Sequence, residues 1–256
     1  MNMANYEEKN SINWDEDIIV PTHEIIRNNE VEEKGRGRKR NRNDIYKNTT
    51  LGLVMGCVGE KDLDGQSEMY KFLYEKDIED KLEELKLEGI KVPSKSRIIK
   101  DFKQIHDQLG ARYIDIINTQ SNGLCYVIKQ SYEGKYFVAI PLYKWKELNL
   151  CTNKEMLRLF TVISMHEKIS TTNSVIMTRA YLCKCMDINP TPANQNYIGT
   201  MTNALFKLGL VDIETEDRIE YDEAREQRVS KTYNWFRLTT KEEWEEKSKK
   251  KKKKRK

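Results

Sequence analysis

The chain contains few of the residues that metal or nucleophile chemistry requires. Its three histidines are His23, His106 and His166, and no two are spaced so that a helix would bring both to one face. The one close pair among its five cysteines, Cys183 and Cys185, is two residues apart, a spacing that separates the thiols on a helix. We therefore expect no metal site, no catalytic nucleophile and no cofactor.

The glycines at positions 56 and 59 come closest to a phosphate-binding loop. Such a loop has four residues between its glycines and a Ser or Thr after its lysine, whereas two residues separate Gly56 from Gly59 and Asp62 follows Lys61. Carboxylates are abundant, but they fall on charged, solvated faces where raised pKa values are not expected. The sequence therefore predicts a protein that is not an enzyme.

Polar side chains on two predicted helices are better suited to nucleic-acid recognition. The first helix follows Pro93. The side away from its apolar stripe carries cations that can bind phosphate groups and guanine bases. These cations are Lys95, Arg97, Lys100 and Lys103. The second helix, over residues 192–208, carries amides and hydroxyls that can read base edges, with a tyrosine and a lysine beside them. These side chains are Asn194, Gln195, Asn196, Tyr197, Thr200, Asn203 and Lys207. A solvated polar face without a ligand is the alternative.

A charged loop is predicted between the last two strands, after residue 214 and before residue 232. Its cations suit a wing that grips phosphate, and they are Arg218, Arg225, Arg228 and Lys231. The same loop carries five carboxylates, at Asp217, Glu220, Asp222, Glu223 and Glu226. An ordinary exposed loop of mixed charge is therefore the alternative to a wing that binds DNA.

The formal net charge of +4 is distributed unevenly. Nine basic groups lie at Lys247 and residues 249–256, and six lie in residues 34–42. Without these fifteen, 30 Lys and Arg remain against 41 Asp and Glu, a balance of −11. The basic character belongs to two tails, which are either arms that bind phosphate nonspecifically or solubilising flanks.

Two stretches of the chain repeat the order helix, helix, hairpin. The first has helices predicted over residues 67–87 and from Pro93 to Gly110, followed by strands at 113–117 and 124–128 around an Asn-Gly turn. The apolar stripe of the second of these helices is Ile98, Phe102, Ile105 and Leu109. The other stretch has a strand at 137–141, helices after Asn153, at 176–186 and at 192–208, and strands at 210–214 and 232–238.

This pattern predicts an α+β fold of two tandem winged-helix domains with disordered, basic N- and C-terminal tails. Residues 1–48 are expected to be disordered, with a short ordered piece near residues 14–20. Residues 49–132 form the first winged-helix-like domain, 133–240 the second, and 241–256 a short helix with a lysine-rich tail. No stretch approaches the roughly 18–20 apolar residues that cross a bilayer, and the N-terminus lacks a basic region followed by an apolar one. We therefore expect a cytoplasmic protein with no membrane partner.

The second half also resembles a known family in four segments. They are residues 136–141 (Tyr-Phe-Val-Ala-Ile-Pro), 153–160 (Asn-Lys-Glu-Met-Leu-Arg-Leu-Phe), 178–182 (Thr-Arg-Ala-Tyr-Leu) and 203–211 (Asn-Ala-Leu-Phe-Lys-Leu-Gly-Leu-Val). This pattern is similar to the winged-helix domains in replication proteins of Gram-positive plasmids and phages. The layout of two repeats resembles that of the iteron-binding plasmid initiators, which use tandem winged helices.

The resemblance implies a sequence-specific protein that binds double-stranded DNA, in replication initiation or copy control of a plasmid or phage. A homodimer and replication proteins of the host are further candidate partners. A winged-helix transcriptional regulator is the first alternative. A protein-interaction module is the second, because a fold alone does not fix its function.

Overall fold

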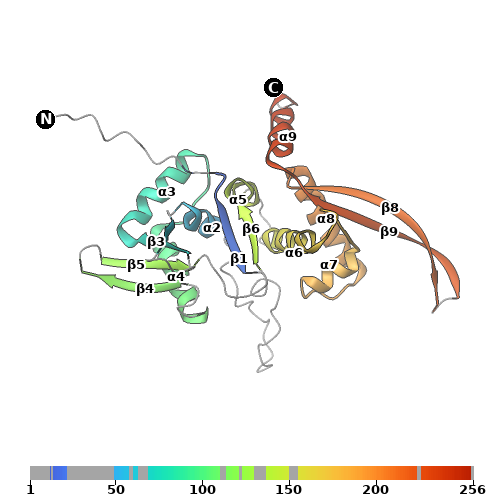
Figure 1. Cartoon of the computed structure of the whole chain (residues 1–256), viewed down its shortest axis with the longest axis horizontal. Coiled ribbons are helices and arrows are strands. Elements are labelled where there is room, and N and C mark those ends of the chain that lie inside the picture. The colour runs from blue at the N-terminus through green and yellow to red at the C-terminus, as the bar shows by residue number, and fades with distance from the viewer. Residues whose placement is uncertain are drawn as a thin grey trace. The chain divides into compact units, whose positions relative to one another are not determined.

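The computed structural model describes residues 12, 14–21, 49–57, 60–62, 69–109, 114–120, 123–129, 137–149, 155–223 and 226–254. These residues form a mixture of helices and strands, so the predicted α+β class is confirmed (Figure 1). They belong to two compact units. The first unit contains the elements from β1 to α5, and the second contains those from α6 to α9.

The first unit is built on a four-stranded antiparallel sheet in the order β2-β3-β5-β4. Its strands are β2 (Glu60–Asp62), β3 (Met69–Tyr74), β4 (Ile114–Thr119) and β5 (Gly123–Lys129). The predicted hairpin is confirmed as β4 and β5, with Gly123 at a φ of 73° that favours glycine. The helix predicted over residues 67–87 is wrong in its first part, because β3 pairs with β5 along its length from Tyr70 to Tyr74.

Five helical segments are described in the first unit. They are α2 (Thr49–Gly56), the 3₁₀ helix η1 (Glu75–Asp77), α3 (Ile78–Leu87), α4 (Lys95–Leu109) and α5 (Leu142–Asn149). Three residues of the predicted apolar stripe of α4, Ile98, Phe102 and Ile105, are confirmed as buried, and the side chain of Leu109 lies outside the described part. Phe102 stacks on Tyr126 of β5 with ring centroids 4.7 Å apart, which joins the helix to the sheet.

An N-terminal strand, β1 (Asp17–Pro21), pairs with β6 (Phe137–Pro141) and confirms the ordered piece expected there. The backbone carbonyls of Glu16 and Trp14 accept hydrogen bonds from the amides of Leu142 (2.9 Å) and Tyr143 (3.0 Å). These bonds satisfy the first amides of α5, which have no partner within the helix. The sequence placed residues 137–141 at the start of the second domain, whereas β6 and α5 lie in the first unit.

The described part of the second unit contains three helices, a three-stranded sheet and a C-terminal helix. Its elements are α6 (Glu155–Ile169), β7 (Val175–Met177), α7 (Arg179–Cys185), α8 (Pro192–Leu208), β8 (Val211–Asp222), β9 (Gln227–Leu238) and α9 (Lys241–Lys254). The helix predicted over residues 176–186 begins only at Arg179, because the Thr178 hydroxyl accepts the Tyr181 amide and caps it. The helix predicted over residues 192–208 is confirmed, and Gly209 ends it in the left-handed conformation with φ 79°.

Two segments of the second unit are more regular than the sequence predicted. The stretch expected to be a loop between residues 214 and 232 is largely strand, so β8 and β9 form a long hairpin that extends beyond the helices of this unit (Figure 1). The lysine run is helical as far as Lys254, where a disordered tail was expected. Ion pairs one turn apart, Lys249 with Glu245 (3.8 Å) and Lys250 with Glu246 (2.7 Å), favour this helix.

The two units share one order of elements. Each contains helix, strand, helix, helix, strand, strand, as α2-β3-α3-α4-β4-β5 and as α6-β7-α7-α8-β8-β9, with β2 and the 3₁₀ helix η1 added in the first unit. In each sheet the three common strands lie in the order first, third, second, as β3-β5-β4 and β7-β9-β8. The helices α4 and α8 therefore occupy the same position in the two units.

Candidate nucleic-acid interface

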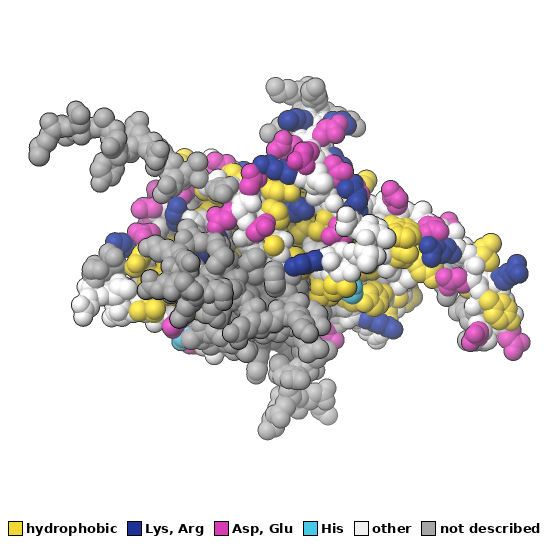
Figure 2. Space-filling view, viewed as in Figure 1, with side chains coloured by type: hydrophobic (Ala, Val, Ile, Leu, Met, Phe, Trp, Pro, Cys, Tyr) yellow, Lys and Arg dark blue, Asp and Glu magenta, His cyan; other side chains and the backbone are white. Residues whose placement is uncertain are grey.

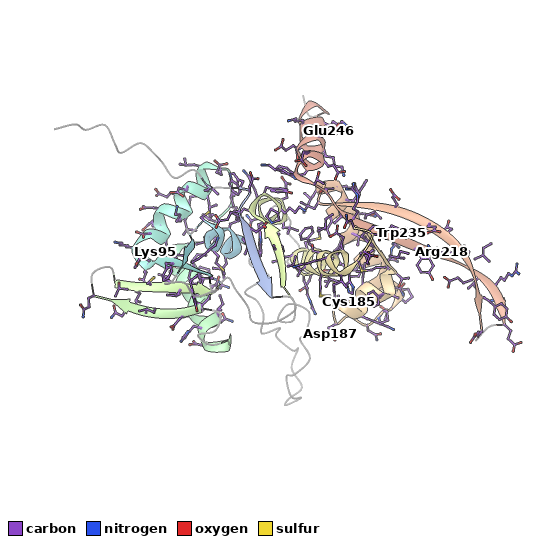
Figure 3. The ribbon with its side chains drawn as sticks, viewed as in Figure 1. Lys95, Cys185, Asp187, Arg218, Trp235 and Glu246 are labelled. Atoms are coloured by element: carbon purple, nitrogen blue, oxygen red, sulfur yellow. The ribbon has the colours of Figure 1, made fainter. Side chains whose placement is uncertain are left out.

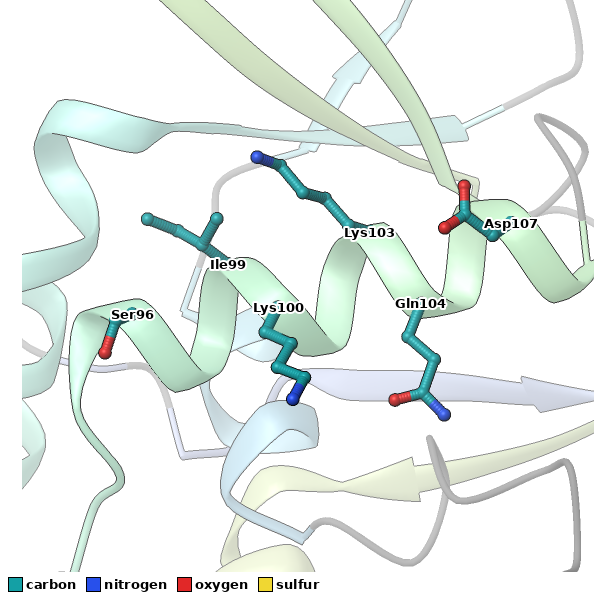
Figure 4. A pocket seen from close by; sticks show the side chains of 6 residues that line it. All are labelled: Ser96, Ile99, Lys100, Lys103, Gln104 and Asp107. Atoms are coloured by element: carbon teal, nitrogen blue, oxygen red, sulfur yellow. The ribbon is translucent and has the colours of Figure 1, made fainter.

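Helix α4 turns one face to the core and the opposite face to solvent. Its buried residues are Ile98, Asp101, Phe102 and Ile105. Its outer face carries a row of exposed side chains at successive spacings of four, three and four residues, which we call the α4 stripe: Ser96, Lys100, Lys103 and Asp107. An open depression follows this stripe, and Ile99 and Gln104 complete its lining (Figure 4).

The four cations predicted on α4 differ in their availability to a ligand. Lys100 and Lys103 are exposed, and neither has an ion-pair partner in the part of the chain that the structure describes. The guanidinium of Arg97 pairs instead with Asp101 one turn later, at 2.9 Å. Lys95 lies at the first position of the helix and is half-buried. Lys100 and Lys103 are therefore the cations that α4 offers to a phosphate.

Helix α8 repeats the same arrangement with neutral polar side chains. Its buried residues include Ile198, Met201, Thr202 and Leu205, which have the spacing of the buried residues of α4. Its exposed row, the α8 stripe, again has spacings of four, three and four residues: Asn196, Thr200, Asn203 and Lys207. Tyr197, which is 39% exposed, lies beside this row. Amide groups that face solvent in this way can donate to and accept from base edges.

Two of the predicted base-reading residues hold the turn before α8 instead. The side-chain amide of Asn194 donates to the carbonyl of Asn189 (2.8 Å), and that of Gln195 donates to the carbonyl of Pro190 (2.9 Å). The Thr200 hydroxyl donates to the carbonyl of Asn196 (3.1 Å), which leaves its oxygen as an acceptor toward solvent. Asn196, Thr200 and Asn203 are therefore the better placed of the predicted readers.

Sequence reasoning missed Arg179, the first residue of α7, which lies against α8. A Cβ atom at Gly199 would come within 2.9 Å of the Arg179 guanidinium carbon, so the guanidinium rests on the α8 backbone at that glycine. The signal available in the sequence was Gly199 itself, because a glycine inside a helical pattern usually has a packing reason.

The β8–β9 hairpin, where the sequence predicts either a basic wing or an exposed segment of mixed charge, carries an acidic face. Cross-strand partners share a face, and the carboxylates that alternate along one face of β8 are Asp212, Glu214, Glu216 and Glu220. Acidic, basic and hydrophobic side chains are interspersed on the visible side of the hairpin (Figure 2). The sequence assigned phosphate contacts to this segment, and its described side chains carry both acidic and basic groups.

Arg218 is neutralised within this acidic face. Its guanidinium donates to Glu216 (2.8 Å) and lies 5.5 Å from the ring centroid of Tyr233 and 5.9 Å from that of Trp235 (Figure 3). Glu216 also accepts the Trp235 indole N–H (2.9 Å). Hydrogen bonds from Arg218 and Trp235 hold the pKa of Glu216 below its usual value. Arg228 is exposed opposite Tyr221, while Arg225 and the side chain of Lys231 lie outside the described part.

Helix α9 is fixed to the base of the hairpin. Arg237 donates to Glu243 at 2.9 Å and to Asp212 at 2.5 Å, and Lys247 forms an ion pair with the same Asp212. The Arg237 hydrogen bonds hold the pKa of Glu243 below its usual value. Among the described side chains after Lys247, those of Lys249 and Lys250 form ion pairs within α9 itself.

One group of potentially reactive side chains lies on the second unit. His166 Nε2 is 3.4 Å from the Tyr181 hydroxyl and 3.8 Å from the Cys185 sulfur. Burial lowers the pKa of His166 and raises that of Cys185, so at neutral pH both are uncharged and the thiol is not activated. Within the described residues, no group of three or more His, Cys, Asp or Glu side chains is placed to hold a metal ion.

Comparisons with protein-family models, with curated proteins and with solved structures give no match to this chain. None of the helices in the ranges described above is both long enough and apolar enough to cross a membrane.

Proposed function

We propose that this protein binds double-stranded DNA without catalysis, through α4 and α8 of two winged-helix domains. The shared order of elements and the sheet order first, third, second support this fold assignment. In helix-turn-helix folds the second helix of the motif enters the major groove, and α4 and α8 hold that position. The observation that carries the proposal is the pair of exposed stripes on these helices, which have the same spacing and take no part in either core.

The α4 stripe and the α8 stripe offer different chemical groups to DNA. Lys100 and Lys103 offer charge for phosphates, whereas Asn196, Thr200 and Asn203 offer amides and a hydroxyl for base edges. The first helix would then position the protein on the duplex, and the second would select the sequence.

Replication initiation or copy control of a plasmid or phage is the role that we propose, on the resemblance of residues 136–211 to such proteins. Transcriptional regulation is the alternative role. The two roles differ in the binding site, because an initiator with two readers suits direct repeats, whereas a dimeric regulator suits an inverted repeat.

A footprint of the full chain on a duplex selected from a random library tests the proposal. We expect protection of two successive major grooves, about one helical turn apart. Reversal of Lys100 and Lys103 to Glu is expected to shorten the footprint at one end only, because only α4 would no longer hold its phosphates. Reversal of Lys86, an exposed lysine of α3 in the same unit, is the control and should leave the footprint unchanged. Protection of one groove that the α4 reversal does not alter would remove the first unit from the DNA-binding role.

A protein-interaction module is the second candidate, and one observation favours it. Ile219 and Tyr221, two residues apart on one face of β8, are 75% and 62% exposed. Large apolar side chains in such a position are typical of protein contacts. Loss of a protein complex, but not of duplex binding, on changing both to Ser would favour this candidate.

A further inference from the structure

Arg179 lies across α8 at the one buried glycine of that helix. The ideal Cβ position of Gly199 is 2.9 Å from both Cζ and Nε of Arg179, and 3.3 Å from one terminal nitrogen. Any side chain larger than hydrogen at position 199 would therefore displace the guanidinium. Asn196 is three residues before Gly199 and Asn203 is four residues after it, which are the spacings of neighbours on a helix surface. The guanidinium thus lies beside the α8 stripe.

The position of Arg179 is not explained by the stability of its own helix. It is the first residue of α7, and a cation in the first turn opposes the helix dipole. Arg179 is exposed, and no carboxylate among the described residues pairs with it. In α4 the position that corresponds to Gly199 by the burial pattern is Ile99, so the arrangement is specific to the second unit.

We infer that Arg179 binds a backbone phosphate of the DNA duplex that α8 reads, and that Gly199 is required to seat it there. This inference rests on the proposed function and adds a contact to it. A guanidinium offers several N–H donors in a planar fork that matches phosphate oxygens. It comes from the neighbouring helix and lies at the edge of the α8 stripe, where the sugar-phosphate backbone borders a groove occupied by a helix. Contact with α8 restricts the side chain, so less conformational freedom is lost when the phosphate binds.

The test compares the affinity of the full chain for a selected duplex and for a random duplex over a range of salt concentrations. Arg179→Ala is expected to weaken binding to both duplexes by a similar factor, and to reduce the slope of log K against log salt by about 0.9, the value for one phosphate. Arg179→Lys keeps the charge and should restore the slope. Lys184→Ala, at another exposed cation of α7, is the matched control and should leave both affinities unchanged.

Substitution of Gly199 provides a second, independent test of the inference. Gly199→Ala keeps every charge, yet it should weaken binding because it displaces the guanidinium, and Arg179→Ala should then have little further effect. Thermal unfolding of Gly199→Ala identifies any loss of folding, and the results for the Arg179 variants can be interpreted without this variant.

If Arg179→Ala lost affinity for the selected duplex alone, the assignment would be overturned in favour of a base contact. Unchanged affinity in Arg179→Ala, with duplex binding by the unaltered chain intact, would overturn this inference and leave the proposed function standing. Failure of the unaltered chain to bind any duplex would overturn both.

Discussion

Gly52 leaves space for the indole ring of Trp145, since a Cβ atom at position 52 would lie only 2.5 Å from Cζ3 of that ring. One turn later, a Cβ atom at Gly56 would lie 2.5 Å from Cδ2 of Leu142. The two glycines therefore form the face of α2 that packs on α5. This contact gives a packing reason for Gly56, which the sequence had already excluded from a phosphate-binding loop.

Substitution of Gly52 by Ala is expected to destabilise the first unit. Alanine favours a helix over glycine by about 0.8–1.0 kcal/mol, but overpacking a core costs about 1–3 kcal/mol. The clash falls on a rigid ring that is 1% exposed, so we expect the unfavourable effect to exceed the favourable one. A lower midpoint of urea unfolding would measure it.

The matched control places the same substitution in a Trp145→Phe background. The smaller ring removes the atoms that clash with position 52, so the cost of Gly52→Ala should fall. Trp145→Phe itself loses no hydrogen bond to the described residues, because the buried indole N–H has no partner among them. An equal cost in the two backgrounds would show that the indole is not the source of the strain.

The parts of the fold that the sequence predicted correctly are those in which one local pattern determines the structure. Helix α8 occupies the residues 192–208 that the sequence predicted, with a capping threonine before it and a glycine after it. Strand β3 was missed because Lys71 occupies an inward position that a hydrophobic pattern would assign to an apolar residue. Lys71 is fully buried and forms an ion pair with Glu16, 55 residues away in sequence. No local pattern contains that partner.

The long hairpin was missed for a different physical reason. Beyond the core-facing residues Val211 and Phe236, the described side chains of its strands are half-buried or exposed, and charged residues separate the apolar side chains of Ile213, Ile219 and Tyr221. Backbone pairing continues regardless, as far as Asp222 with Gln227. A strand whose exposed side chains are mostly charged is difficult to distinguish from a charged loop by its sequence.

In the candidate site, the sequence predicted the residue types better than their roles. Asn194 and Gln195 have the amides of a base reader, but those amides are bonded to the turn before α8. We therefore expect Asn196→Ala with Thr200→Ala to lower the preference for a selected duplex over a random one, by about 1–3 kcal/mol for each base-reading side chain removed. Nonspecific affinity should hardly change, because neither side chain is charged.

The comparison variant for this experiment is Asn194→Ala. It should lower thermal stability, because the Asn189 carbonyl loses a donor, while leaving the ratio of selected to random affinity unchanged. Competition between the two duplexes measures the ratio directly. If Asn196→Ala with Thr200→Ala left it unaltered, α8 would have no part in reading the sequence.

Deletion of the lysine run at the C-terminus tests nonspecific DNA binding, and the structure indicates where the deletion should begin. Because Lys247 forms an ion pair with Asp212 and Glu243 is bonded to Arg237, the anchors of α9 precede residue 249. Deletion of residues 249–256 should therefore leave the fold intact and weaken binding to all duplexes alike. The slope of log K against log salt should become shallower by about 0.9 for each phosphate that the tail no longer neutralises.

A shorter deletion, of residues 251–256, keeps the lysines that pair with Glu245 and Glu246 and should have an intermediate effect. Circular dichroism checks that the helix content falls only by the residues removed. Retention of the full salt slope after the longer deletion would make the run a solubilising flank, and the phosphate contacts would then belong to α4 and α7.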